Sequence, residues 1–150
     1  MTGILCRQTA NDDDLAQCLE IRRKVFVQEQ HLFDETDQDE HDARAIHLAA
    51  FFQNRIVGTV RVYEEADGTW WGGRLAVLKK YRGRAGRELV LSAIATVKKQ
   101  GALIFYANIL IENVNFFLNL GWRTVGLKFL LHGRMHQLVE ADLQPGNRRS

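Results

Sequence analysis

Residues 74–90 join a short apolar run to a basic, glycine-containing turn and then to an amphipathic segment. The apolar run, residues 75–78, predicts a strand. A helix with one apolar side is predicted after the turn by Leu89, Val90, Ala93, Ile94 and Val97. The turn would direct backbone N–H groups and the positive end of the helix dipole to one place, and this arrangement binds phosphate.

The turn itself, residues 79–87, carries both glycine and arginine. Glycine lets a ligand approach the backbone and adopts left-handed φ values at little cost. Arginine can hold a phosphate through two N–H groups at once. The stretch lacks the glycine spacing and the Lys-Ser/Thr pair of a nucleotide P-loop. Taken alone, these residues fit either a phosphate site or a solvated basic turn.

Length and composition narrow the class of protein. A chain of 150 residues is long enough for one domain with a core, expected at residues 1–144 with 145–150 as a tail or linker. The net charge of +2 is too small to indicate a nucleic-acid partner. The two cysteines form neither a disulfide framework nor a metal site, and no apolar run approaches the ~20 residues that cross a membrane. We expect a cytoplasmic protein without a metal or a membrane partner.

The remaining hydrophobic pattern predicts a mixed α/β (α+β) sheet of six to seven strands with helices on both faces. Strands are expected at residues 4–8, 46–52, 56–63, 70–78, 102–109, 122–131 and 135–143. Helices are expected from an N-cap at Asn11 or Asp12 through Phe26, from the basic turn to Gln100, and through residues 116–120. Gly72 and Gly73 indicate a bulge or a close backbone approach within their strand.

Residues 34–42 contain six acids among nine positions. One interpretation is a solvated loop, and the other is the rim of a site that attracts a cationic, amine-bearing substrate. His47 and Arg61 interrupt apolar strands. A histidine in such a place is either a hydrogen-bonded core residue or a group with a chemical role.

Several segments, in their order and spacing, resemble the GNAT (GCN5-related) N-acetyltransferases, and most of all the small bacterial members. They are residues 22–30 (RRKVFVQEQ), 47–49 (HLA), 56–61 (IVGTVR), 74–83 (RLAVLKKYRG), 113–122 (NVNFFLNLGW) and 132–136 (HGRMH). The resemblance covers nearly the whole chain. It implies a mostly antiparallel sheet that is splayed at its middle, beside residues 74–78.

The resemblance also implies acetyl-CoA as co-substrate, an amine of a small molecule or peptide as acceptor, and a possible homodimer. The pantetheine arm would pair with the backbone of Leu75, Ala76 and Val77. The pyrophosphate would lie on Arg82, Gly83, Arg84, Ala85, Gly86 and Arg87. The other side of the cofactor would face Asn108, Phe116 and Phe117.

Two positions depart from the family's pattern. The phosphate loop, residues 80–85 (KYRGRA), fits it with Lys80 in the place of Gln or Arg. Phe117 stands where many relatives carry a tyrosine that protonates the leaving thiolate. These departures keep open a second function, a CoA-binding regulatory module without turnover. A nucleic-acid-binding domain is a third alternative, but the basic patch of residues 79–87 is short for a phosphate backbone.

In a direct transfer, a neutral amine attacks the thioester carbonyl and a general base takes the proton of the amine. Glu29, His47 and Glu112 are candidates for the base by their chemistry. Glu29 and His47 rank first, because they lie in the half of the chain that builds the acceptor pocket in this family. The Val77 N–H is the expected donor to the oxyanion.

Overall fold

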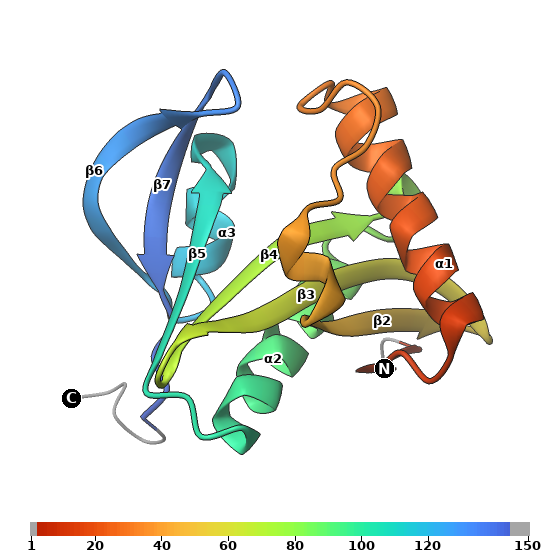
Figure 1. The fold of residues 1–150 in the computed structure, drawn as a ribbon, viewed down its shortest axis with the longest axis horizontal. Coiled ribbons are helices and arrows are strands. Elements are labelled where there is room, and N and C mark those ends of the chain that lie inside the picture. Colours follow the sequence, from red (N-terminus) through yellow and green to blue (C-terminus); the bar gives the residue numbers. More distant parts are fainter. Residues whose placement is uncertain (1–2, 145–150) are drawn as a thin grey trace.

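The bounds of the strands in the computed structural model are β1 Ile4–Gln8, β2 Ile46–Phe52, β3 Arg55–Ala66, β4 Thr69–Val77, β5 Ile104–Leu110, β6 Arg123–Leu131 and β7 Arg134–Glu140. The structure describes residues 3–144, so the tail expected at 145–150 lies outside the described residues. Within residues 3–144 the strands form one sheet in the order β1-β2-β3-β4-β5-β7-β6 (Figure 1). In this sheet β4 and β5 run parallel, and the other neighbouring strands are antiparallel.

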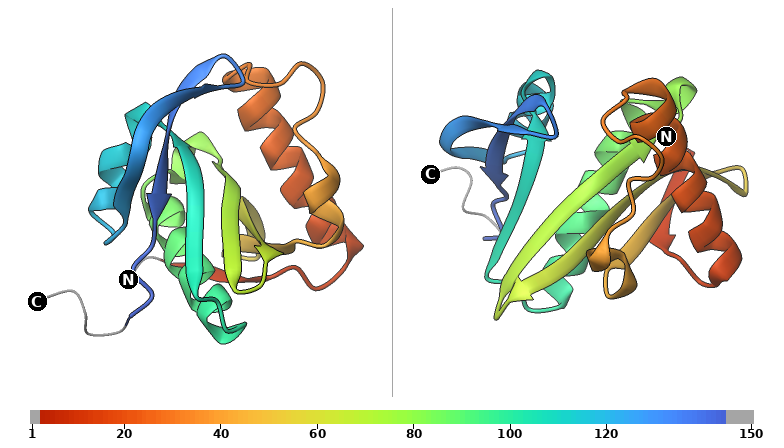
Figure 2. Two further views of the ribbon diagram at one scale, coloured as in Figure 1. Left: turned by 60° about the vertical axis from the view of Figure 1, so that its left-hand side comes forward. Right: turned by 45° about the horizontal axis from the view of Figure 1, so that its top comes forward.

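The helices are α1 Asp12–Arg22, α2 Arg84–Lys99 and α3 Val114–Leu118, with a π-helical turn η1 Arg23–Glu29 and short 3-10 turns η2 Glu40–Ala43, η3 Lys79–Tyr81 and η4 Ile111–Asn113. The long helices α1 and α2 pack on opposite faces of the sheet (Figures 1 and 2). The predicted α+β fold, with a mostly antiparallel sheet and helices on both faces, is therefore confirmed. None of the helices in the described part of the chain is long and apolar enough to cross a membrane.

Successive side chains of β2 pack on opposite faces of the sheet. Leu48 and Ala50 are buried in the cluster that includes α2, while Ala49 between them is buried in the cluster that includes α1. Successive side chains of a strand point to opposite faces, so a continuous apolar run can fill both layers at once. On α2, Leu89 and Val97 are fully buried, as the apolar side of that segment predicted.

Capping and chain continuity place α1 against the sheet. The Asn11 side chain accepts a hydrogen bond from the Asp14 N–H at 2.8 Å, which confirms the predicted N-cap. The helix then continues as η1 to Glu29, beyond the predicted limit at Phe26. Because of this extension, Phe26 and Gln30 reach the open middle of the sheet.

The sheet opens between β4 and β5. The two strands pair from Thr69 and Ile104 to Gly72 and Ala107, and beyond these positions they separate (Figures 1 and 2). A Cβ at Gly72 would lie 2.9 Å from Cζ of Phe105, so glycine is required where the strands still touch. The close approach at Gly72 is thus made by the Phe105 side chain and not by another backbone segment.

Directly after the paired region, β4 bulges against β3. Arg61 is opposite Gly73 and Thr59 is opposite Ala76, so two residues of β4 oppose one residue of β3. Arg74 lies in this bulge with a left-handed φ of 52°. A bulge bends its strand and increases the local twist, and this one lies directly where β4 parts from β5.

Candidate active site

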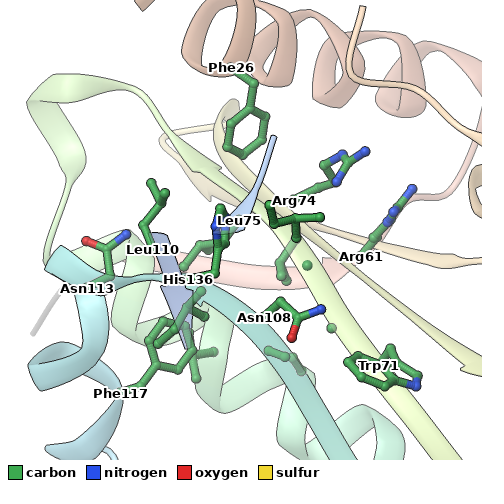
Figure 3. A pocket seen from close by; sticks show the side chains of 18 of the residues that line it. Phe26, Arg61, Trp71, Arg74, Leu75, Asn108, Leu110, Asn113, Phe117 and His136 are labelled. Atoms are coloured by element: carbon green, nitrogen blue, oxygen red, sulfur yellow. The ribbon is translucent and has the colours of Figure 1, made fainter. Parts of the chain in front are cut away.

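A cleft fills the gap between the diverging strands (Figure 3). Its walls come from residues 72–75 of β4 and 107–110 of β5, and the α2 residues Val90 and Ala93 lie at its base. The segment around the end of α1 and the β6–β7 hairpin add Phe26, Gln30, Leu32, Phe33, Leu131, His132 and His136, and further lining residues include Arg61 and Tyr63 of β3 and Phe117 of α3. A long groove between two strand edges suits an extended ligand that can pair with backbone.

The β4 side of the cleft offers backbone donors. The Leu78 N–H donates to the Val57 carbonyl at 2.9 Å, towards β3. Because N–H groups of a strand alternate in direction, the Val77 N–H points the other way, to the side of the cleft. This residue is therefore oriented as expected for a donor to a bound carbonyl group.

The N-terminus of α2 has no side-chain cap. Its N-cap is Gly83, with φ of 92°, and its first turn contains no acid. By contrast, α1 is capped by Asn11 and has three acids in its first turn. The first N–H groups of a helix have no partner inside the helix, and an anion can satisfy them. A Cβ on Gly86 would be 3.6 Å from Cζ of Phe116, so the α2 start faces α3 across the open end of the sheet.

The arginines of the turn have different surroundings. Arg82 Nε donates to the Val77 carbonyl at 2.9 Å, and its two other nitrogens bind the Glu29 carboxylate at 2.7 Å each. This hydrogen bond lowers the pKa of Glu29 and raises that of Arg82. Arg84 lies over the Phe52 ring at 5.8 Å, and Arg87 is exposed.

Two of the three residues expected on the opposite side of a cofactor, Asn108 and Phe117, line the cleft, and Phe116 does not. Leu110 lies beside Asn108 on β5, and Leu75 of β4 lies across from them (Figure 3). Phe117 is buried and packs edge-on against Trp122, with ring centroids 5.2 Å apart. It can contribute packing there but no proton.

In the acidic segment of residues 34–42, Asp34, Glu35 and Glu40 are exposed, as the solvated loop predicted, whereas the other three acids are paired with arginines. Asp37 is buried, and its carboxylate accepts a hydrogen bond from Arg22 Nε at 2.7 Å. The other two guanidinium nitrogens of Arg22 donate to Asp42 at 2.8 and 3.0 Å. The solvated loop is therefore wrong for these acids, and their paired charges are not available to attract a cationic substrate.

The same segment also holds two arginines of the cleft wall. Asp39 accepts hydrogen bonds from Arg61 at 2.6 and 2.9 Å and from Arg74 at 3.2 Å. Arg74 also donates to the Asp37 backbone carbonyl, and its guanidinium lies 4.7 Å from the Phe33 ring centroid. Burial and the charge of Arg61 lower the pKa of Arg74. These contacts fix the loop to the side chains of Arg61 and Arg74 in the cleft wall.

The three residues expected to include the general base lie outside the cleft wall. Glu29 is bound to Arg82, and Glu112 is bound to Arg134 at 2.7 Å. His47 is buried in β2, where Nε2 is 3.0 Å from the Asp42 carbonyl oxygen and Nδ1 has no partner among the described residues. Their catalytic roles stay predictions.

Two histidines of the cleft, His132 and His136, were not predicted as functional residues from the sequence. His132 lies at the turn of the β6–β7 hairpin, and its ring is 4.6 Å from that of Phe33. His136 lies on β7, is buried, and points into the cleft (Figure 3). The pattern HGRMH marked the hairpin, but only the pairing of β7 with β5 shows which histidine faces the gap.

Known proteins are similar to this chain over most of its length. The sequence profile of the Acetyltransferase (GNAT) family matches residues 14–122. A Bacillus subtilis (strain 168) protein, whose name places it among acetyltransferases, is 33% identical over 139 residues, covering 89% of this chain and 92% of its own. The crystal structure of Escherichia coli ElaA has a TM-score of 0.82 at 21% identity, covering 93% of this chain and 99% of that one. BjaI, a CoA-dependent acyl-homoserine lactone synthase solved with SAM and isopentyl-CoA, has a TM-score of 0.80 at 19% identity, covering 95% and 85%.

Proposed function

Because this chain belongs to the acetyltransferase (GNAT) family, we propose that it transfers an acetyl group from acetyl-CoA to an amine of a small molecule or peptide. The observation that carries the proposal is the early parting of β4 and β5, which leaves a cleft between their free edges. A CoA thioester combines an amide-bearing arm with a pyrophosphate, and the cleft and the α2 start suit these two parts.

The pantetheine arm would lie along Leu75, Ala76 and Val77 as an added strand. The pyrophosphate would lie at the first turn of α2, where the N-cap Gly83 is exposed and has no side chain to keep a phosphate away from the backbone. Asn108 and Phe117 would border the arm from β5 and α3. BjaI, a CoA-dependent enzyme of similar fold that was solved with isopentyl-CoA, supports a CoA derivative as a ligand for this fold.

Chemistry at this cleft needs three elements. The amine must reach the thioester carbonyl at about 3–3.5 Å. The oxyanion that forms must receive a hydrogen bond, and the Val77 N–H has the direction for it. The CoA sulfur then leaves with the electron pair of its bond to carbon. Phe117 cannot protonate that sulfur, so another group or water must do so.

Calorimetric titration with acetyl-CoA, followed by an amine panel read out as released CoA thiol, tests this function. Gly83→Glu and Gly101→Glu form a matched pair at the two ends of α2. Both glycines have positive φ, 92° and 87°, and a Cβ on either meets no atom within 4 Å. Both variants carry similar backbone strain, of about 1–2 kcal/mol. Only Gly83→Glu places a carboxylate at the proposed phosphate site.

We expect tight binding that Gly83→Glu loses and Gly101→Glu keeps, together with turnover on at least one amine. Equal loss in both variants would contradict the proposed phosphate site. Binding without product on any amine would instead favour a CoA-binding regulatory module, the second candidate, which Phe117 in place of a proton donor supports.

A further inference from the structure

His136 has the geometry of a proton acceptor inside the cleft. On β7 it is opposite Leu110 of β5 and Phe129 of β6, and it is 6% exposed. Its Nδ1 is 2.9 Å from the Arg134 carbonyl oxygen. A carbonyl oxygen can only accept a hydrogen bond, so Nδ1 carries the hydrogen and Nε2 of the neutral ring carries a lone pair.

That lone pair is not used by the protein. Within residues 3–144, Nε2 of His136 has no hydrogen-bond partner, although the side chain lines the cleft. The bond to Arg134 holds the ring in one orientation and one tautomer. Nε2 can therefore accept a hydrogen bond or a proton from a ligand in the cleft.

The other titratable residues of the cleft wall are less suited to accept a proton. No Asp or Glu belongs to the wall formed by the described residues. Arg61 and Arg74 stay protonated, as arginines in proteins do. Burial raises the pKa of Tyr63, so its hydroxyl stays protonated at neutral pH. His132 is exposed at the hairpin turn and packs on Phe33.

On the basis of the acetyl transfer proposed above, we propose that His136 Nε2 accepts the proton of the attacking amine and returns it to the leaving sulfur. The amine nitrogen forms a bond to the thioester carbonyl carbon, and its proton passes to Nε2. The carbon–sulfur bond then breaks, and the sulfur leaves with the electron pair as a thiolate. The imidazolium gives its proton to that thiolate, which yields the amide, CoA thiol and neutral His136.

This cycle supplies the proton that Phe117 cannot give. A histidine suits both steps because its charge changes near neutral pH. One residue can also serve both steps in turn, since the proton removed from nitrogen equals the proton needed on sulfur. No further acid is required in the cleft.

The test compares His136→Gln with His31→Gln in the full chain. His31 is exposed and lies outside the cleft wall, so it controls for the loss of a histidine. We expect kcat to fall about 100-fold in His136→Gln, with the acetyl-CoA affinity and the unfolding midpoint retained. Added imidazole should partly restore turnover in His136→Ala, because it can occupy the emptied site.

The pH profile of kcat/KM provides the second readout. His132 and Arg74 also face this part of the cleft, so His132→Gln is measured to assign the acidic limb. We expect the acidic limb to disappear in His136→Gln and to persist in His132→Gln.

Unchanged kcat in His136→Gln, with the wild type active, would overturn the role of His136 and leave the acetyl transfer intact. Loss of acetyl-CoA binding without rescue by imidazole would show a structural role and would also overturn it. A wild type that makes no product with any amine would overturn the acetyl transfer, and the role of His136 with it.

Discussion

Arg22 and Asp37 form a buried ion pair, in which Arg22 Nε donates to Asp37 Oδ2 at 2.7 Å and each side chain is 1% exposed. The pair joins the C-terminal end of α1 to the loop that binds Arg61 and Arg74 of the cleft wall. Arg22 extends the link to Asp42 through its two remaining nitrogens. One guanidinium thus fixes two points of a loop that has little regular structure of its own.

Removing one partner of this pair should be costly. We expect Asp37→Asn to lower the free energy of unfolding by about 3–5 kcal/mol, because it leaves the buried Arg22 charge without full compensation. Glu40→Gln is the control, since the Glu40 side chain is 82% exposed in the same segment and should change stability by less than about 0.5 kcal/mol. Denaturant unfolding measures both, and equal effects would contradict the importance of the pair.

Stability should also fall in acid. Burial alone would raise the pKa of Asp39 and Asp42, but hydrogen bonds from Arg61 and Arg22 outweigh it and lower both values. A carboxyl with a lowered pKa in the folded state stabilises the protein above its unfolded pKa of about 4. That contribution is lost as pH falls below about 4. Unfolding midpoints between pH 6 and pH 3 test this, and Asp42→Asn should give a flatter curve than the wild type.

The two glycines of β4 should respond differently to alanine. A Cβ at Gly72 would lie 2.9 and 3.0 Å from two atoms of the buried Phe105 ring, while a Cβ at Gly73 meets nothing within 4 Å. We expect Gly72→Ala to cost about 1–3 kcal/mol through overpacking. Gly73→Ala should cost less than about 1 kcal/mol. Thermal or denaturant unfolding of the two variants tests this. Similar losses of unfolding free energy in both variants would mean that the strands can separate at Gly72 without strain.

Glu29 and Arg82 should act as one unit. Their bidentate pair is exposed by 37% on each side, so breaking it should cost no more than about 1 kcal/mol of stability. Because Arg82 also binds the Val77 carbonyl, we expect Glu29→Gln and Arg82→Gln to weaken acetyl-CoA binding alike. If Glu29→Gln instead lowers kcat at least about tenfold with binding intact, Glu29 acts as the base.

The acceptor should carry a single positive charge. Arg61 and Arg74 line the cleft, and among the described residues no carboxylate does. Both arginines are already paired with acids of residues 37–42, so the wall offers no free carboxylate to compensate the desolvation of a second ammonium group. We expect kcat/KM for an arylalkylamine to exceed that for spermidine at least about tenfold, which corresponds to about 1.4 kcal/mol. A preference for the polyamine would show that the paired acids of the loop become available to the substrate.

The sequence predicted the elements of this fold well, because each is encoded locally. The hydrophobic period, the glycines and the basic charges of residues 74–90 were enough to predict the strand, the turn and the helix there. The residues next to Asn11 were enough to predict a helix N-cap. The role of the acidic segment was missed for the opposite reason. Asp37 and Asp42 are paired by Arg22, and this residue lies 15 and 20 positions away in the sequence. The charge of an aspartate does not show which residue it pairs with in the folded chain.

His136 was missed for a similar reason. A histidine in an apolar strand gives no sign of which face it occupies until the register of β7 against β5 is known. Conversely, Glu29 fits a general base by its chemistry, and only the fold shows that Arg82 holds it. Local pattern thus predicts elements, while the site depends on how distant elements meet.

The short pairing of β4 with β5 makes the proposed cofactor a missing strand of the sheet. Beyond Gly72 and Ala107 the facing edges of these strands have no neighbouring strand among the described residues. A pantetheine arm that fills the gap would join the two half-sheets, so the free energy of unfolding would rise with acetyl-CoA concentration, by about 2.7 kcal/mol at 100 times Kd. The Val77 amide would then exchange its hydrogen with solvent more slowly. The stability of the sheet would therefore report the fraction of the protein that has acetyl-CoA bound.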